Sequence, residues 1–137
     1  MLDRKYEYSY EKMMREIETY IHKEDDLNLI KKAYEYALKK HTGQFRKSGE
    51  PYIIHPIAVT TILAGLNCGP NTLCAGLLHD VVEDTETSLD DIKTLFNEDI
   101  AEMVDGVTKV TKLQFSSLKA QQVTNHQKML LAMASDI

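Results

Sequence analysis

Apolar residues recur at helical spacing along almost the whole chain, and no segment alternates strictly between apolar and polar positions as a half-buried β-strand does. Near the start, the apolar positions Met13, Ile17, Tyr20 and Ile21 predict the inner face of a first helix. The pattern predicts helices over approximately residues 9–22, 27–42, 55–67, 72–84, 88–96, 99–110 and 117–135. We therefore expect an all-α fold.

Residues that begin or end helices support several of these boundaries. Gly43 is expected just after the second helix, in the conformation that commonly ends a helix. Proline is favoured in a first turn, so His55-Pro56 predicts the start of the third helix. Residues 69–71 (GPN) separate the third helix from the fourth, and residues 88–91 (SLDD) resemble a capping box that begins the fifth. The inner face of the second helix is expected to consist of Leu29, Ile30, Ala33, Tyr34, Ala37 and Leu38.

Length and composition describe one domain, expected to span residues 1–137. With 43% hydrophobic residues, the chain has enough apolar material for a core. Its formal net charge of −5 argues against DNA or another nucleic acid as a partner, because a broad basic face is not expected.

Cysteine usage and the N-terminus bear on the compartment. Cys68 and Cys74 have neither zinc-ligand spacing nor a disulfide framework, so buried reduced thiols are expected. The charged N-terminus lacks the apolar core of a signal peptide, and no apolar run is long enough to span a membrane. A cytoplasmic protein without membrane association is the prediction.

The segment Leu78-His79-Asp80-Val81-Val82-Glu83-Asp84-Thr85 carries the most specific chemical signal. It follows the nearly uncharged residues 72–78, so His79 and Asp80 are expected at the polar end of an apolar helix. His55, from the preceding helix, can supply a third metal ligand. Imidazole and carboxylate ligands suit several first-row divalent ions, and ligand type alone does not choose among them.

Helix geometry places two further carboxylates beside this pair. Residues four apart share a helix face, so Glu83 lies over His79 and Asp84 lies over Asp80. The two pairs occupy adjoining faces about 100° apart. One helix end can therefore hold a metal ion and present acid–base groups to a water molecule whose pKa the ion lowers.

Each feature also has an ordinary structural explanation. An isolated His-Asp pair usually has no function, and Glu83-Asp84 alone is typical of a solvated helix end. The apolar segment before them favours a cleft, where perturbed acids are often functional. Among the other histidines, His22 is expected at the surface, His126 in solvent or ordinary packing, and His41 in a structural role at a helix end.

Four motifs together resemble the N-terminal hydrolase domain of the Rel/Spo family, bacterial enzymes that make and degrade the alarmones ppGpp and pppGpp. The motifs are residues 41–52 (HTGQFRKSGEPY), His55-Pro56, residues 79–85 (HDVVEDT) and residues 105–109 (DGVTK). Each alone is weak, but their order and spacing are specific. The resemblance covers most of the chain from about Leu29 onward, and it implies a compact multi-helix fold of the HD phosphohydrolase superfamily.

The resemblance implies roles for particular residues. The family's manganese ligands, paired catalytic carboxylates and guanosine-binding loop all have counterparts in this chain. The counterparts of the manganese ligands are His55, His79 and Asp80. Those of the catalytic carboxylates are Glu83 and Asp84, and those of the guanosine-binding loop are Arg46, Lys47 and Ser48. The implied reaction is hydrolysis of the 3′-pyrophosphate of ppGpp or pppGpp, which yields GDP or GTP plus pyrophosphate and helps control the stringent response.

The charges of the loop agree with this assignment. Residues 36–49 contain basic residues and no acid, in a chain that is acidic overall. Lys39 and Lys40 also suit a helix C-terminus, so Arg46 and Lys47 carry the argument. A positive patch beside a metal site attracts a highly charged anion, and a planar guanidinium can stack on a base.

Two departures from the family pattern concern the end of the chain. The family's fourth metal ligand is an Asp in a helix beyond Ile137, and Asp136 belongs to the preceding helix pattern. Residues 124–127 (TNHQ) also lack the usual glutamate and final basic residue. We therefore expect a fragment of a protein that also has synthetase and regulatory domains. Weak metal binding, impaired hydrolysis and self-association through an uncovered apolar surface are expected of it.

Three functions compete at this point. The first is an alarmone pyrophosphohydrolase that depends on manganese. The second is a catalytically silent HD module that regulates a GTP pyrophosphokinase, and the complete set of candidate residues argues against it. The third is another HD nucleotide phosphohydrolase, which the loop Arg46-Lys47-Ser48 disfavours.

Overall fold

The computed structural model describes residues 8–115, with side chains described for residues 8–108. Within these residues the elements are α-helices and one isolated β-bridge, which confirms the all-α prediction. The helices are α1 (Tyr10–Glu18), α2 (Glu24–Lys40), α3 (Ile54–Gly65), α4 (Pro70–Asp84), α5 (Leu89–Leu95) and α6 (Glu98–Phe115). The predicted helix over 117–135, which contains His126, lies outside the described residues, as does Asp136.

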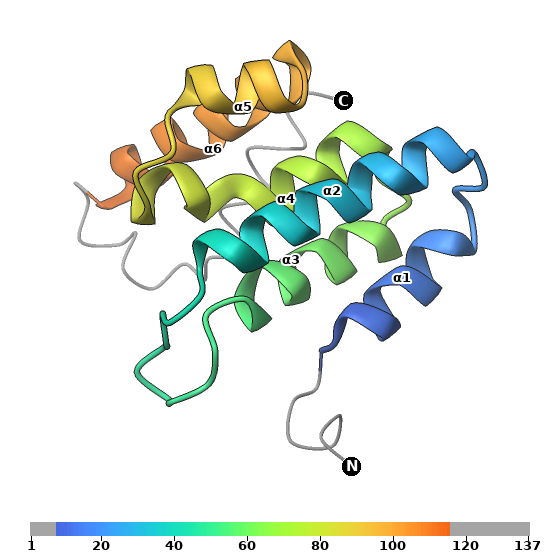
Figure 1. Ribbon diagram of the computed structural model, residues 1–137, viewed down its shortest axis with the longest axis horizontal. Helices are drawn as coiled ribbons and strands as arrows, with labels where there is room; N and C mark the ends of the chain where they lie inside the picture. The colour runs from blue at the N-terminus through green and yellow to red at the C-terminus, as the bar shows by residue number, and fades with distance from the viewer. Residues whose placement is uncertain (1–7, 116–137) are drawn as a thin grey trace.

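Helix α4 occupies the middle of the fold (Figure 1). It packs against α2, α3 and α6, while α1 packs on α3 and α5 packs on α6. Every residue of α4 from Thr72 to Val81 is buried, as expected for a helix that is apolar on nearly all sides. The burial ends within the last turn, so the polar end of a core helix reaches the surface there.

The outer helices α1 and α2 each bury one face. In α1 the buried residues Met13 and Ile17 lie one turn apart, and the Ser9 hydroxyl accepts a hydrogen bond from the backbone N–H of Lys12 at 3.2 Å. The chain leaves α1 earlier than predicted, although Ile21 remains buried. Acidic residues in the first turn of α2 complement its dipole.

The second helix departs from the prediction near its end. Its buried residues are Ile30, Ala33 and Ala37. The prediction that Leu38 lies on the inner face is wrong, because its side chain is 41% exposed. Leu38 follows Ala37 and points about 100° away from it, off the buried face. His41 is the C-cap, so Gly43 lies in the turn beyond it, with a φ of +84°.

The first turns of α3 and α4 each contain a proline, at different positions within the turn. Helix α3 begins at Ile54, so Pro56 is its third residue and not its first, as the sequence had suggested. The first N–H groups of a helix have no partner within the helix, and a proline fits at any of these positions. Pro70 follows the N-cap Gly69 of α4, as the sequence pattern indicates.

Side-chain caps begin the last two described helices. The predicted capping box of α5 is confirmed: the Ser88 hydroxyl accepts from the Asp91 N–H at 3.1 Å, and the Asp91 carboxylate accepts from the Ser88 N–H at 3.0 Å. Before α6, the side-chain oxygen of Asn97 accepts from the N–H of Ile100 at 2.8 Å, a cap that pattern analysis did not identify.

The two cysteines are buried free thiols, as predicted. Burial raises the pKa of the Cys74 thiol to about 12, so it is not a nucleophile at neutral pH. Among the described helices, none combines the length and apolar character needed to cross a membrane.

Candidate metal centre

Three of the predicted ligands meet in a buried cluster formed by the start of α3 and the third turn of α4. The Nε2 atoms of His55 and His79 lie 3.3 Å and 2.9 Å from the same oxygen, Oδ2 of Asp80. All three residues are buried, and their candidate ligand atoms lie within 4.8 Å of one another. Atoms that each bind one cation at about 2 Å have separations of this size. The donor set and its spacing therefore fit a single divalent ion.

The orientation of the His79 ring is fixed by a hydrogen bond at the nitrogen that does not face Asp80. Its Nδ1 lies 2.7 Å from the carbonyl oxygen of Gly76, one turn earlier in α4. Because a carbonyl oxygen only accepts, Nδ1 carries a proton and Nε2 faces Asp80. Histidines that bind metals are commonly held in this way through their second nitrogen.

Gly76 also sets the distance between the two helices that supply the ligands. A Cβ atom at this position would lie 2.8 Å from Oγ1 of Thr60 and 2.9 Å from Cδ1 of Leu63, both on α3. The absence of a side chain at Gly76 lets α3 approach α4 closely. Since α3 carries His55, this close packing helps to bring His55 up to the His79-Asp80 pair.

Burial and charge decide the protonation of the cluster. Burial is the main cause of a lowered pKa for His55. Burial also opposes the charged form of His79, but Asp80 and the Gly76 carbonyl outweigh it and raise the pKa. Despite burial, the two imidazoles hold the pKa of Asp80 well below its usual range. Asp80 is therefore a carboxylate, and a cation would displace the proton between it and His79.

Tyr52, which the sequence analysis did not single out, completes the cluster. Its hydroxyl donates a hydrogen bond to Oδ2 of Asp80 at 2.8 Å. Its ring centroid lies 5.9 Å from that of His55 and 4.7 Å from that of His41. Burial, followed by the charges of Asp80 and Asp84, raises the pKa of Tyr52, so the phenol keeps its proton.

The loop between α2 and α3 is a narrow hairpin closed by a bridge between Phe45 and Pro51. The N–H of Arg46 donates to the carbonyl of Glu50 at 2.9 Å, and the N–H of Gly49 donates to the carbonyl of Arg46 at 2.8 Å. Gly49 has a φ of +93°, which glycine adopts without steric cost. The exposed turn consists of Lys47, Ser48 and Gly49.

Arg46, one of the three predicted loop residues, contacts residues beside the cluster. Its Cζ atom is 6.0 Å from the centroid of the Tyr52 ring, and its Nε is 3.7 Å from a carboxylate oxygen of Glu50. After burial and the neighbouring His79, its charge also helps to lower the pKa of His55. The half-exposed guanidinium thus lies close enough to the cluster of candidate ligands to influence His55 and remains accessible to solvent.

The two further predicted carboxylates lie at the exposed end of α4. Glu83 adds to the influences that raise the pKa of His79, after Asp80 and the Gly76 carbonyl. The Asp84 carboxylate contributes in the same way to the raised pKa of Tyr52. Both residues are exposed and border the buried cluster.

His41 and Gln44, which follow the last residue of α2, link the hairpin to α4. His41 is buried, and its Nδ1 lies 2.8 Å from Oε1 of Gln44. The side-chain nitrogen of Gln44 donates to the backbone carbonyl of Asp84 at 3.1 Å. These contacts agree with the structural role expected for His41, and His22 is exposed as predicted.

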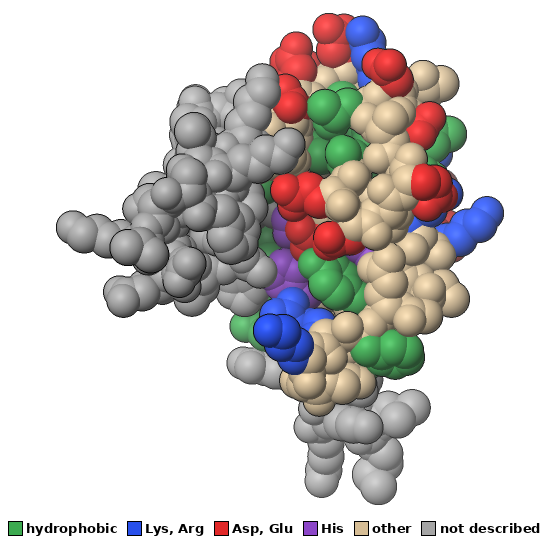
Figure 2. All heavy atoms as spheres, turned by 90° about the vertical axis from the view of Figure 1, so that its left-hand side faces the viewer, with side chains coloured by type: hydrophobic (Ala, Val, Ile, Leu, Met, Phe, Trp, Pro, Cys, Tyr) green, Lys and Arg blue, Asp and Glu red, His purple; other side chains and the backbone are tan. Residues whose placement is uncertain are grey.

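Figure 2 shows the distribution of charge around the histidines. Histidine atoms are visible between a group of acidic side chains on one side and Lys and Arg side chains on the other. The candidate metal ligands therefore have an acidic side and a basic side, and the basic side attracts anions.

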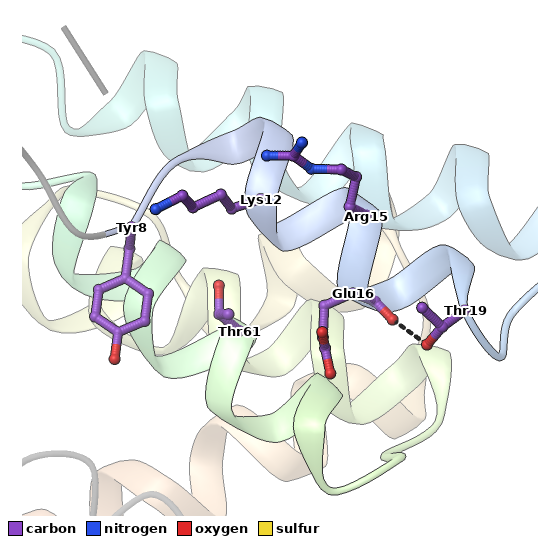
Figure 3. A pocket seen from close by; sticks show the side chains of 6 residues that line it. All are labelled: Tyr8, Lys12, Arg15, Glu16, Thr19 and Thr61. Atoms are coloured by element: carbon purple, nitrogen blue, oxygen red, sulfur yellow. Dashed lines mark hydrogen bonds between the residues drawn. The ribbon is translucent and has the colours of Figure 1, made fainter. Parts of the chain in front are cut away.

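A separate cavity of about 490 Å³ lies between α1 and α3 (Figure 3). It is lined by Tyr8, Lys12, Arg15, Glu16, Thr19 and Thr61. None of the predicted site residues lines it. Its charged residues are exposed and of both signs, so nothing about them selects a ligand.

The helical fold and the His-His-Asp cluster agree with a comparison to known families. The family model described as HD domain matches residues 33–137. The chain therefore belongs to the HD-domain family, in agreement with the resemblance found in the sequence.

Particular relatives make the similarity more specific. The chain is 45% identical over 130 residues to the bifunctional (p)ppGpp synthase/hydrolase SpoT of Escherichia coli K12, an alignment that covers 95% of this chain and 18% of SpoT. It is 53% identical over 110 residues to a GTP pyrophosphokinase of Streptomyces coelicolor, which covers 80% of this chain and 13% of that protein. The chain thus spans less than a fifth of the length of these curated relatives, and the resemblance to the Rel/Spo family is confirmed.

A solved structure is similar as well. It is described as a metazoan orthologue of SpoT that hydrolyses ppGpp and has a role in starvation responses. The TM-score is 0.59 at 32% sequence identity, and the match covers 76% of this chain and 65% of the other.

Proposed function

We propose that the protein to which this chain belongs hydrolyses the 3′-pyrophosphate of guanosine alarmones, converting ppGpp or pppGpp to GDP or GTP plus pyrophosphate. The observation that carries the proposal is the buried cluster of His55, His79 and Asp80, with carboxylates at its exposed edge and Arg46 beside it. Relatives named for alarmone hydrolysis give the substrate class. A role in the stringent response follows from that substrate.

We propose manganese as the ion held by His55, His79 and Asp80. The donor atoms fit a divalent cation, while the choice of manganese comes from the family resemblance and not from ligand type. Such an ion supplies Lewis acidity, which lowers the pKa of water and stabilises charge on a phosphoryl oxygen.

The chain's own residues then have separate tasks. A water oxygen attacks the phosphorus bonded to the ribose 3′-oxygen, and that phosphorus–oxygen bond breaks. Glu83 and Asp84 orient the water and accept its proton, and the departing 3′-oxygen ends with a proton. Arg46, with Lys47 and Ser48, holds the guanosine, and the basic side of the site attracts the phosphates.

The direct test is pyrophosphate release from ppGpp with added manganese, measured on the chain extended past Ile137. We expect release that requires the metal and stops when EDTA removes it. The companion assay measures ppGpp binding without turnover and the cleavage of other nucleotides. Binding without release would favour the silent regulatory module, and cleavage of other nucleotides in preference to ppGpp would favour a different HD phosphohydrolase.

Arg46 provides a test of the guanosine assignment. If its planar guanidinium stacks on guanine, Arg46→Ala should raise KM more than it lowers kcat, because the interaction is present before the transition state. Arg46→Lys should not restore KM, since lysine lacks a planar face. Steady-state kinetics with ppGpp measures both constants.

The matched control is Arg15→Ala, which removes an exposed arginine from α1. Its kinetic constants should remain those of the wild type. If Arg46→Lys binds substrate as tightly as the wild type, charge alone is sufficient and the stacking assignment is wrong.

A further inference from the structure

Tyr52 has contacts that its place in a surface loop does not explain. Its backbone N–H donates to the carbonyl of Gln44 at 2.9 Å, which ties it across the hairpin. Its own carbonyl accepts from the N–H of His55 at 3.0 Å, in the first turn of α3. The backbone of Tyr52 is therefore held by the hairpin on one side and by a candidate metal ligand on the other.

The side chain makes a second connection, to α4. The hydroxyl donates to Oδ2 of Asp80 at 2.8 Å, although the two residues are far apart in sequence. The same oxygen lies 2.9 Å from Nε2 of His79 and 3.3 Å from Nε2 of His55. A donor from outside the ligand set thus restrains the carboxylate at the centre of the cluster.

The ring of Tyr52 is itself restrained. It packs against the buried ring of His41, with centroids 4.7 Å apart, and Arg46 lies over it at 6.0 Å. The hydroxyl is thus held in place by packing, which is what a partner needs if it is to orient a metal ligand.

We propose that Tyr52 is a positioning residue that orients Asp80 for metal binding and so couples the hairpin to the metal centre. This inference rests on the proposed function, because it requires that Asp80 binds a cation. A carboxylate can approach a cation through either oxygen and in several orientations. The hydrogen bond from Tyr52 restricts that choice, and the loss of such a partner typically weakens metal binding about 10–100-fold.

The test is Tyr52→Phe, which keeps the ring and its packing and removes only the hydroxyl. We expect the Kd for manganese, measured by isothermal titration without nucleotide, to rise about 10–100-fold. Hydrolysis should fall at limiting manganese and recover when manganese is raised above the new Kd. A structural role alone would not produce this recovery.

Tyr20→Phe is the matched control. Tyr20 is also half-buried, and its hydroxyl donates to a backbone carbonyl, that of Cys68, at 2.7 Å. Thermal unfolding of the metal-free proteins should show comparable losses for the two variants. Only Tyr52→Phe should change the affinity for manganese.

The outcomes separate this inference from the proposed function. If the wild-type chain binds manganese and Tyr52→Phe binds it equally tightly, the positioning role is wrong while the metal centre stands. If Tyr52→Phe remains slow at saturating manganese, the hydroxyl acts in the reaction and not through Asp80. If the wild-type chain binds neither manganese nor another divalent ion, the metal centre fails and the inference fails with it.

Discussion

His79→Ala is expected to abolish manganese-dependent hydrolysis of ppGpp. The substitution removes a nitrogen that lies 2.9 Å from Asp80 in the candidate ligand cluster. It also leaves the Gly76 carbonyl without the donor that Nδ1 provides at 2.7 Å. The second effect lowers stability by about 0.5–1.5 kcal/mol, the usual net contribution of one hydrogen bond, because the Gly76 carbonyl keeps its partner within the helix. Manganese titration and thermal unfolding measure the two effects separately.

A second variant distinguishes lost metal from lost stability. In His79→Asn the side-chain amide nitrogen stands near the position of Nδ1, so it can still donate to Gly76 while the atom that faces Asp80 is gone. We expect this variant to be more stable than His79→Ala and equally inactive. The control is His22→Ala, which removes an exposed histidine and should change neither property. Wild-type activity in either His79 variant would rule out His79 as a ligand.

Most of the fold could be predicted because burial in a helical protein leaves a periodic pattern. The stripe with Met13 and Ile17 and the capping box at Ser88 both appear in the structure as expected. The predictions of the fold are wrong or incomplete where contacts between distant parts of the chain determine burial or capping. Leu38 is apolar yet 41% exposed, since the buried face of α2 is narrower than its apolar face. Asn97 caps α6 with a side chain whose role is visible only once the turn before the helix is known.

The candidate site was predictable to the extent that its residues are close in sequence or chemically distinctive. His79 and Asp80 are adjacent, and a third histidine ahead of them is a recognisable ligand. Tyr52 could not be predicted in this way, because tyrosine has no strong association with metal sites. Its contact with Asp80 depends on how the hairpin packs against α4.

Helix α4 is buried along most of its length and yet carries ionisable residues of the candidate site. A helix buried along most of its length would ordinarily contain no ionisable groups, because an unpaired buried charge is costly. His79 and Asp80 offset this cost by pairing with each other and with partners from α3 and the hairpin. The same arrangement holds the candidate ligand atoms within 4.8 Å of one another.

Glu83→Gln is expected to lower the turnover of ppGpp about 10²–10⁴-fold, the usual contribution of general acid–base catalysis. The change removes the negative charge and nearly preserves the shape of the side chain. Glu83 lies one turn beyond His79 on α4 and is exposed, so it borders the ligand cluster without belonging to it. Its loss should therefore affect proton transfer much more than metal affinity. Single-turnover kinetics at saturating manganese measures the first quantity and isothermal titration the second.

Glu86→Gln is the control for a charge change in the same region. Glu86 is an exposed glutamate just beyond α4, and its carboxylate pairs with Lys40 at 2.6 Å. Removing this charge should leave turnover near the wild-type value, because an exposed ion pair contributes little. If Glu83→Gln instead loses manganese and activity together, Glu83 is a metal ligand. If it retains full turnover while Asp84→Asn does not, Asp84 alone accepts the proton, and the shared role proposed for the two carboxylates is wrong.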